Sequence, residues 1–306
     1  MGKRLNRSDY FIVYMIIISL ACLVGGFFLG ICVMKSKAQA EIEAITKDYT
    51  IKLNQDQMEK TKKLYKEEDF VSFYYNVFAP LEKFKQSHLT FQNKVANSSA
   101  GDYKSILSAA QDQANETLKK IEQANVSNSS PLLIQAKQEY MKSLQVYMDG
   151  MNQMNDGDTT KLTPQEMSQH LESFKRNWLR AQADFYKAIA IWEEMYVTNK
   201  PLVQQVSQSN ISIEQWKSYP FNLRDYLAAE NLYRNNVMVP FQPEDITARI
   251  DGVVLTNQAS SLGWKDIPFA FRVLFTTDAV RPGDFKSLKN KLYPGFKSPE
   301  LQFFNE

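Results

Sequence analysis

The first strong pattern along the chain is a run of uncharged, mostly apolar residues from Phe11 to Met34. A helix rises about 1.5 Å per residue, so a run of this length exceeds the hydrocarbon core of a bilayer, which is about 30 Å thick. The pattern predicts a transmembrane helix over residues 11–34. Lys3, Arg4 and Arg7 precede it and favour a cytoplasmic tail over residues 1–10, with the C-terminal domain extracytoplasmic.

A cleaved signal peptide is the alternative interpretation of this segment. Ala38, Gln39 and Ala40 could form a cleavage site of the small-x-small kind. However, the apolar part of a signal peptide usually has about 7–15 residues, and Lys35 and Lys37 stand where a cleavage region is normally uncharged. We therefore expect an uncleaved, single-pass anchor in the cell membrane.

Small residues recur within the predicted span. Cys22, Gly26 and Gly30 are four positions apart and would lie on one face of a helix. Such spacing allows two helix backbones to approach closely, which makes this face a candidate for a transmembrane homodimer. Glycine is also frequent in membrane helices for other reasons, so the motif is not specific.

The next segment, residues 35–67, is polar and contains neither proline nor glycine. Ala38, Ile42, Ile45 and Tyr49 keep a heptad rhythm, which then fades. A sustained coiled coil needs about three to four clean heptads, and this segment has about two. The pattern predicts a helical stalk with short coiled-coil character.

Residues 68–198 carry four long amphipathic patterns with alternating spacings of three and four. Their apolar stripes are Phe70, Tyr74, Val77, Leu81, Phe84, His88, Phe91 and Val95; Tyr103, Leu107, Ala110, Ala114, Leu118 and Ile121; Leu133, Ala136, Tyr140, Leu144, Tyr147 and Met151; and Met167, Leu171, Phe174, Trp178, Ala181, Phe185, Ala188, Trp192 and Met195. Short polar connections join them, and Thr163 to Glu166 reads as a capping box. These features predict an antiparallel four-helix bundle, with Pro80 interrupting the first helix at Ala79.

The rhythm stops after Thr198, and proline and glycine become frequent in residues 199–306. We expect a mostly helical, irregular C-terminal cap region. Short helices are predicted at 212–217, 222–235, 243–251 and 284–292, whereas 269–275 suits either a strand or a helix opened by Pro268. A short hairpin is also compatible with this composition. The predicted fold class is therefore mainly α.

Composition and charge limit the chemistry. The 306 residues include 36 Lys and Arg against 34 Asp and Glu, and this balance does not favour nucleic-acid binding. Two cysteines and two histidines are too few for a disulfide framework or a Cys/His zinc site. No nucleophile, phosphate-loop or metalloprotease motif is present in the sequence, so we assign no catalytic, cofactor-binding or metal residues and expect no enzyme activity.

His88 and His170 lie on the first and fourth predicted helices. Antiparallel packing could bring them together with Glu166 or Glu172 into a metal or acid–base site. A metal site needs three or four convergent ligands, so two ordinary helix histidines are the preferred interpretation.

Aromatic residues indicate where the bundle is packed and where it meets other molecules. Phe174, Trp178, Phe185 and Trp192 share one stripe, which we interpret as bundle core. We expect a protein-interaction module of the cell envelope, with Phe303 and Phe304 near the chain end as candidate contacts with an envelope protein. A solute- or lipid-binding accessory subunit of a transporter or sensor is the alternative, and a cavity above about 300 Å³ would favour it.

Overall fold

The computed structural model describes residues 64–206, 210–301 and 304. The predicted tail, the transmembrane helix and the stalk as far as residue 63 lie outside this range. Within it, no helix combines the length and the apolar character needed to cross a bilayer. The regular elements of the described residues are all helices, which confirms the mainly α class. The hairpin considered for the C-terminal region is not found in this part of the chain.

The helices follow one another through short connections. In chain order they are α2 (Glu67–Phe73), the π-helix η1 (Tyr74–Phe78), α3 (Ala79–Asn97), the 3₁₀ turn η2 (Ala100–Asp102), α4 (Tyr103–Glu122), α5 (Pro131–Asp156), the 3₁₀ turn η3 (Thr159–Lys161), α6 (Pro164–His170), α7 (Glu172–Glu193), the π-helix η4 (Glu194–Thr198), α8 (Ile213–Ser218), α9 (Phe221–Asn235), α10 (Pro243–Val254), α11 (Ile267–Thr276) and α12 (Asp284–Leu292).

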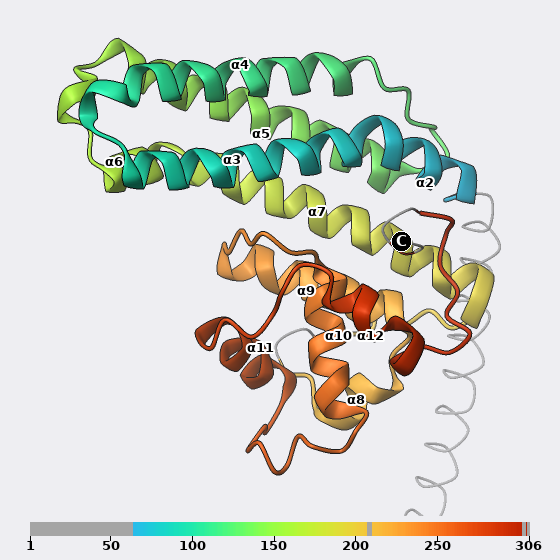
Figure 1. The fold of residues 1–306 in the computed structure, drawn as a ribbon. Helices are drawn as coiled ribbons and strands as arrows, with labels where there is room; N and C mark the ends of the chain where they lie inside the picture. Colours follow the sequence, from blue (N-terminus) through green and yellow to red (C-terminus); the bar gives the residue numbers. More distant parts are fainter. Residues whose placement is uncertain (1–63, 207–209, 302–303, 305–306) are drawn as a thin grey trace, which may run out of the picture. The chain divides into compact units, whose positions relative to one another are not determined.

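The long helices α3, α4, α5 and α7 lie side by side, and consecutive ones run in opposite directions (Figure 1). α4 packs against α3 and α5, and α5 packs against α7. Aromatic rings connect the first helical segment to α7. The Phe185 ring centroid lies 5.3 Å from that of Phe73 and 4.6 Å from that of Phe78, and Phe84 meets Phe174 at 6.0 Å.

The interruption predicted at Ala79 is a change of helix type and not a break, because the chain stays helical through Pro80. The chain is π-helical over Tyr74–Phe78 and becomes α-helical from Ala79. Proline has no backbone N–H, and its ring excludes the carbonyl group four residues earlier from a regular α-helical position. The wider π turn before Pro80 accommodates that carbonyl while the helix continues.

The fourth predicted helix starts where its capping box predicts but has a break. The Thr163 hydroxyl accepts a hydrogen bond from the Glu166 backbone N–H, and the Glu166 carboxylate accepts one from the Thr163 N–H. At Leu171 the backbone leaves helical geometry and separates α6 from α7. At this break α5 approaches closely, and only a glycine fits at position 150, since a Cβ there would lie 3.0 Å from the His170 carbonyl oxygen.

α7 is buried on two faces. One face carries Phe174, Trp178 and Phe185 toward the other long helices. The neighbouring face carries polar side chains toward the C-terminal region: Tyr186 donates to Glu244 at 2.6 Å, and Glu193 accepts from the Asn222 N–H at 3.0 Å. α7 therefore belongs to both parts of the core and packs closely against α9.

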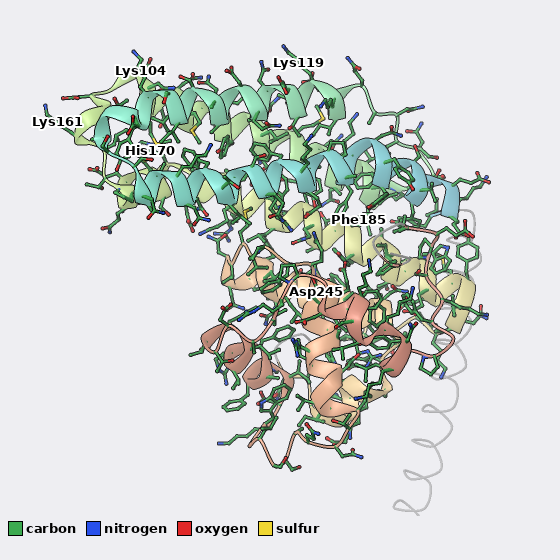
Figure 2. All side chains as sticks on the ribbon, viewed as in Figure 1. Lys104, Lys119, Lys161, His170, Phe185 and Asp245 are labelled. Carbon is green, nitrogen blue, oxygen red and sulfur yellow. The ribbon has the colours of Figure 1, made fainter. Side chains whose placement is uncertain are left out.

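The C-terminal region contains the helices that the sequence predicts, with small shifts. α10 continues to Val254, three residues beyond the predicted end, and α12 has the predicted bounds. The ambiguous segment is a helix, α11, because the Asp266 side chain accepts from the Phe269 N–H at 2.7 Å and Pro268 stands in the first turn. Charged side chains such as Lys104, Lys119 and Lys161 project outward from the long helices (Figure 2).

The packing of Trp178 generates a stability prediction. Its side chain is fully buried, and its ring lies 5.0 Å from Tyr140 and 5.8 Å from Phe84 and Phe174. We predict that Trp178→Ala lowers the free energy of unfolding by about 3–5 kcal/mol, because it leaves a cavity among these rings. Urea denaturation monitored by circular dichroism measures the change.

A matched aromatic control is Tyr75→Ala. Tyr75 is 55% exposed, so its removal should change the free energy of unfolding by no more than about 0.5 kcal/mol. Equal effects of the two substitutions would contradict the assignment of Trp178 to the core.

Candidate functional site

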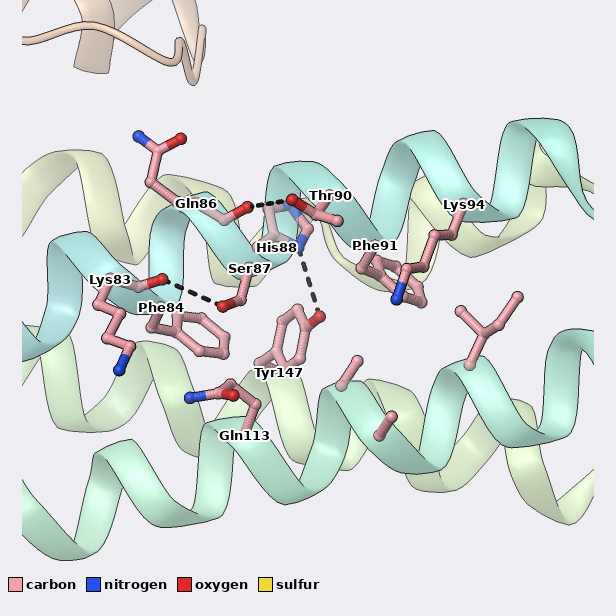
Figure 3. Close-up of a pocket in the computed structure, with 13 residues that line it drawn as sticks. Lys83, Phe84, Gln86, Ser87, His88, Thr90, Phe91, Lys94, Gln113 and Tyr147 are labelled. Atoms are coloured by element: carbon pink, nitrogen blue, oxygen red, sulfur yellow. Dashed lines mark hydrogen bonds between the residues drawn. The ribbon is translucent and has the colours of Figure 1, made fainter.

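A groove of about 390 Å³ lies between α3 and α4 (Figure 3). Its lining comprises Lys83, Phe84, Gln86, Ser87, His88, Thr90, Phe91, Lys94, Ile106, Ala109, Ala110, Gln113 and Tyr147. The volume falls in the range of about 300–1,000 Å³ that is typical of small-molecule sites. This groove is therefore the main candidate for binding.

Side-chain size explains why the groove exists. α3 contributes the rings of Phe84 and Phe91, whereas α4 contributes the short side chains of Ala109 and Ala110. Small residues opposite large ones normally allow helices to approach until the gap closes. Here the aromatic rings lie against Tyr147 and Phe174 instead, so the space in front of the two alanines remains open.

His88 forms part of the wall of the groove and is almost fully buried. Its Nδ1 lies 3.4 Å from the Tyr147 hydroxyl, and its ring packs against Phe174 with centroids 4.9 Å apart. Burial, together with the nearby positive charge of Lys175, lowers the pKa of His88 to about 4. His88 is therefore neutral at neutral pH and contributes a polar but uncharged group.

The charges of the groove come from Lys83 and Lys94, which are both exposed. No aspartate or glutamate lines it. The hydroxyls of Ser87 and Thr90 donate to the helix carbonyls of Lys83 and Gln86 at 3.1 and 2.9 Å. These hydroxyls are therefore not free to donate to a ligand, and the two ammonium groups are the charged donors available there.

The two histidines occupy separate sites. His170 is exposed and its Nδ1 lies 3.2 Å from the Gln153 side-chain oxygen, whereas the partners of His88 are Tyr147, Phe91 and Phe174. Among the described residues, no group of three or more His, Cys, Asp or Glu side chains has an arrangement that could hold a metal ion.

The aromatic stripe assigned to the core is closed. Phe174, Trp178 and Phe185 have no exposed surface and Trp192 has very little. The groove therefore lies beside this stripe and not within it, at a place the sequence analysis did not identify. The spacing of Lys83, Phe84, Phe91 and Lys94 along one helix, opposite a run of alanines, was the available signal.

The expectation for Phe304 requires a correction. Its ring is buried and lies 5.5 Å from Phe296, 6.0 Å from Phe285 and 6.2 Å from Phe221. The ring is therefore not available to a partner, because burial in this aromatic cluster removes it from the surface. Phe303 lies outside the described residues, as do Cys22, Gly26 and Gly30 of the candidate transmembrane dimer face.

The sequence analysis also missed a group of buried charged residues where α7, α9 and α10 meet. Asp251 is fully buried and accepts from Trp216 Nε1 at 2.7 Å, from Arg224 at 2.9 Å and from the Tyr293 hydroxyl at 2.6 Å. Burial raises the pKa of Asp251, and the Arg224 guanidinium opposes this rise. Three donors converge on this carboxylate, so it ties α8, α9 and the segment after α12 to α10.

Two neighbouring carboxyl groups have fewer partners. Neither oxygen of Asp225 has a hydrogen-bond partner among the described residues, and the nearby Thr247 hydroxyl donates to the Pro243 carbonyl. Burial, followed by the charge of Glu244, raises the pKa of Asp225 well above its ordinary value. Burial, followed by the charge of Asp245, raises the pKa of Glu244 to about 8. Both shifts favour the protonated form, because ionising two neighbouring buried carboxyl groups is costly even though the Arg224 charge lowers the pKa of Asp225.

The end of α7 carries two more buried acids. Burial raises the pKa of both Glu193 and Glu194 to about 7. Glu193 accepts from the first-turn N–H of Asn222 in α9, and Glu194 accepts from the N–H groups of Leu202 and Val203. These carboxyl groups satisfy backbone donors where the chain turns from the long helices into the C-terminal region, so their role is structural.

Comparison of the chain with protein-family models, curated proteins and solved structures finds no match in any of the three. The groove and the buried acids therefore have to be interpreted from their own geometry.

The raised pKa of Glu244 leads to a pH prediction. The folded protein retains this proton up to about pH 8, whereas an unfolded chain releases it near the ordinary value of 4.5. The stabilisation from this group is therefore complete below about pH 4.5 and is lost as pH rises toward 8, at about 1 kcal/mol or less per pH unit. In Glu244→Gln the side-chain oxygen can still accept the Tyr186 hydrogen bond, but the group no longer ionises. The substitution should therefore remove this contribution to the pH dependence of stability.

The measurement is urea denaturation of both proteins at pH 5, 6, 7 and 8. The variant should gain stability relative to the native chain as pH rises. Glu116→Gln is the control, since Glu116 is exposed on α4. Its free energy of unfolding should change with pH in the same way as that of the native protein. Parallel curves for Glu244→Gln would show that this carboxyl group ionises normally.

Proposed function

We propose that this chain is a single-pass membrane protein, anchored by residues 11–34 with its N-terminus in the cytoplasm. Two sequence features support this proposal, the length of the charge-free run and the basic flank formed by Lys3, Arg4 and Arg7. Residues 35–67 then serve as a stalk, which is not helical at its described end, residues 64–66. The face formed by Cys22, Gly26 and Gly30 offers a route to a homodimer within the membrane.

The anchored domain acts as an antiparallel four-helix bundle over residues 68–198 that carries the C-terminal cap region over 199–306. The alternating stripes and the short connections support a bundle. The two-sided burial of α7 supports a fixed attachment of the cap region, because α7 contributes Trp178 to one core and Tyr186 to the other.

In this proposal the domain is a protein-interaction module of the cell envelope and not an enzyme. The observation that supports it best is a pair of tyrosines, Tyr75 and Tyr196, that are 55% and 45% exposed; the other exposed large hydrophobic side chains among the described residues are Leu255 and Leu262 of the C-terminal region. Each belongs to a π-helical turn, η1 or η4, at the end of the long helices where α2 begins and α7 ends (Figure 1). π turns are frequent at functional sites, and exposed tyrosines are common interface anchors.

A topology experiment tests the anchor. In a chain with Cys22→Ser and Cys32→Ser, a cysteine at an exposed position of α4, Lys119→Cys, should react with a membrane-impermeant maleimide in intact cells. Lys3→Cys in the same background should react only after lysis, because it lies on the cytoplasmic side. Protection of Lys119→Cys until lysis, or release of the domain into the medium, would refute an uncleaved anchor with this orientation.

Photo-crosslinking tests the interaction surface. A photoreactive phenylalanine analogue at position 75 or 196 should give the same discrete crosslinked product in intact cells, because both positions lie at one end of the long helices. The same analogue at position 119 is the control and should give none. A product of twice the chain mass identifies a second copy as the partner. Identical patterns at all three positions would contradict a specific surface at Tyr75 and Tyr196.

The groove between α3 and α4 supports a second candidate function, the binding of a solute or lipid by an accessory subunit of a transporter or sensor. Its volume of about 390 Å³ and its mixed lining of aromatic rings, amides and two lysines are suited to a small molecule. This function does not exclude the first, since the groove and the two exposed tyrosines are separate sets of residues.

A further inference from the structure

We infer that the groove between α3 and α4 binds an elongated amphipathic anion, with an acid group held by Lys83 or Lys94 at each end and an apolar body along Phe84 and Phe91. This inference rests on the second candidate function, and it names the chemical class of the ligand. Three independent features of the groove lead to it.

The first feature is the sign of the charge. The lining contains two lysines and no carboxylate, although acidic and basic residues are nearly equal in the whole chain. Neither Lys83 nor Lys94 forms an ion pair with any described residue, whereas Lys85 on the same helix is paired with Glu82 at 2.7 Å. Unpaired ammonium groups beside an apolar wall favour a negatively charged ligand.

The second feature is the spacing of these charges. Lys83 and Lys94 are eleven residues apart on α3, which corresponds to about 16 Å along the helix axis. Figure 3 shows their side chains at opposite ends of the row, both directed from α3 toward α4. A single compact acid group cannot meet both ends, so a chain-like ligand with an acid at each end fits better than inorganic phosphate.

The third feature is the middle of the groove. Phe84, Phe91, Ala109 and Ala110 contribute apolar surface between the two lysines, beside the uncharged amide of Gln113, and His88 there is neutral. The Ser87 and Thr90 hydroxyls are engaged with helix carbonyls. The centre therefore suits an uncharged hydrocarbon segment and discriminates against a charge placed midway along the ligand.

A second groove in the structure shows the contrast. It has a volume of about 370 Å³ and is lined by Glu193, Phe221, Tyr293, Phe296 and Lys297, among others. It carries one group of each sign, so its charges do not select an anion. The groove between α3 and α4 differs from this second groove in that its lining combines two lysines with no carboxylate.

The test uses three soluble compounds of similar length: octanedioate, octanoate and 1,8-octanediol. The full chain, labelled in its histidines and held in a non-ionic detergent, is titrated with each and followed by NMR. The chain has two histidines, His88 in the groove and His170 outside it, so each signal reports one place. Octanedioate should shift the His88 signal saturably, should raise the pKa of His88 by its negative charge, and should leave His170 unchanged.

Affinities separate the role of charge from that of the apolar body. We expect octanedioate to bind about tenfold more tightly than the diol, with octanoate between them, since an exposed ion pair contributes a few-fold in affinity. Lys83→Met and Lys94→Met should each weaken octanedioate about three- to fivefold without altering diol binding. The matched control, Lys104→Met, lies outside the groove on α4 and should have no effect.

Each of the other possible results contradicts a specific part of the inference. Equal affinity for octanedioate and the diol would refute anion recognition and leave the groove as a site for neutral apolar solutes. No His88 shift with any compound would refute both the inference and the second candidate function. Equal shifts at His170 and His88, or an equal loss with Lys104→Met, would show non-specific binding and overturn the assignment to this groove.

Discussion

The two-sided packing of α7 is the constraint on which the rest of the described structure depends. Helices in small domains usually bury one stripe and expose the opposite face. α7 instead presents Phe174, Trp178 and Phe185 to the long helices and Gln182, Tyr186 and Glu193 to the C-terminal region. Because a single rigid helix belongs to both parts, neither can shift without breaking contacts in the other. α7 therefore converts a layer of long helices and an irregular C-terminal region into one folded unit.

The second face of α7 is polar, and this has an energetic consequence. Buried carboxyl groups are costly unless they are protonated, paired or hydrogen-bonded. Asp251 has three donors, including Arg224, while Asp225 has none among the described residues. Replacing such a network by apolar groups often gives equal or greater stability, so we expect this network to contribute to the specificity of the packing of α7 against α9 and α10 more than to its stability. The same network makes the stability of this region sensitive to pH near neutrality.

The functional proposals depend on features that remain at the surface after this packing is satisfied. A closed aromatic core leaves no room for a ligand between α5 and α7, whereas the alanines of α4 leave a groove in front of α3. The exposed tyrosines lie in π turns, which are frequent at functional sites. The groove shares Phe84 and Phe91 with the core, whereas its two lysines and the two tyrosines are exposed.

The sequence by itself determined the helical class, the helix starts at Thr163 and Ser212, and the buried stripes of the long helices, because capping and three–four spacing are local properties. Only the tertiary structure decided that a second face of α7 would be covered by the C-terminal region. It also decided that Asp225 and Glu244 would be buried and that Phe304 would join an aromatic cluster. Tertiary packing also produced the groove, because the gap depends on which side chains of α3 and α4 stand opposite each other. The physical reason is range: local rules act within a few residues, whereas burial is set by segments far apart in the chain.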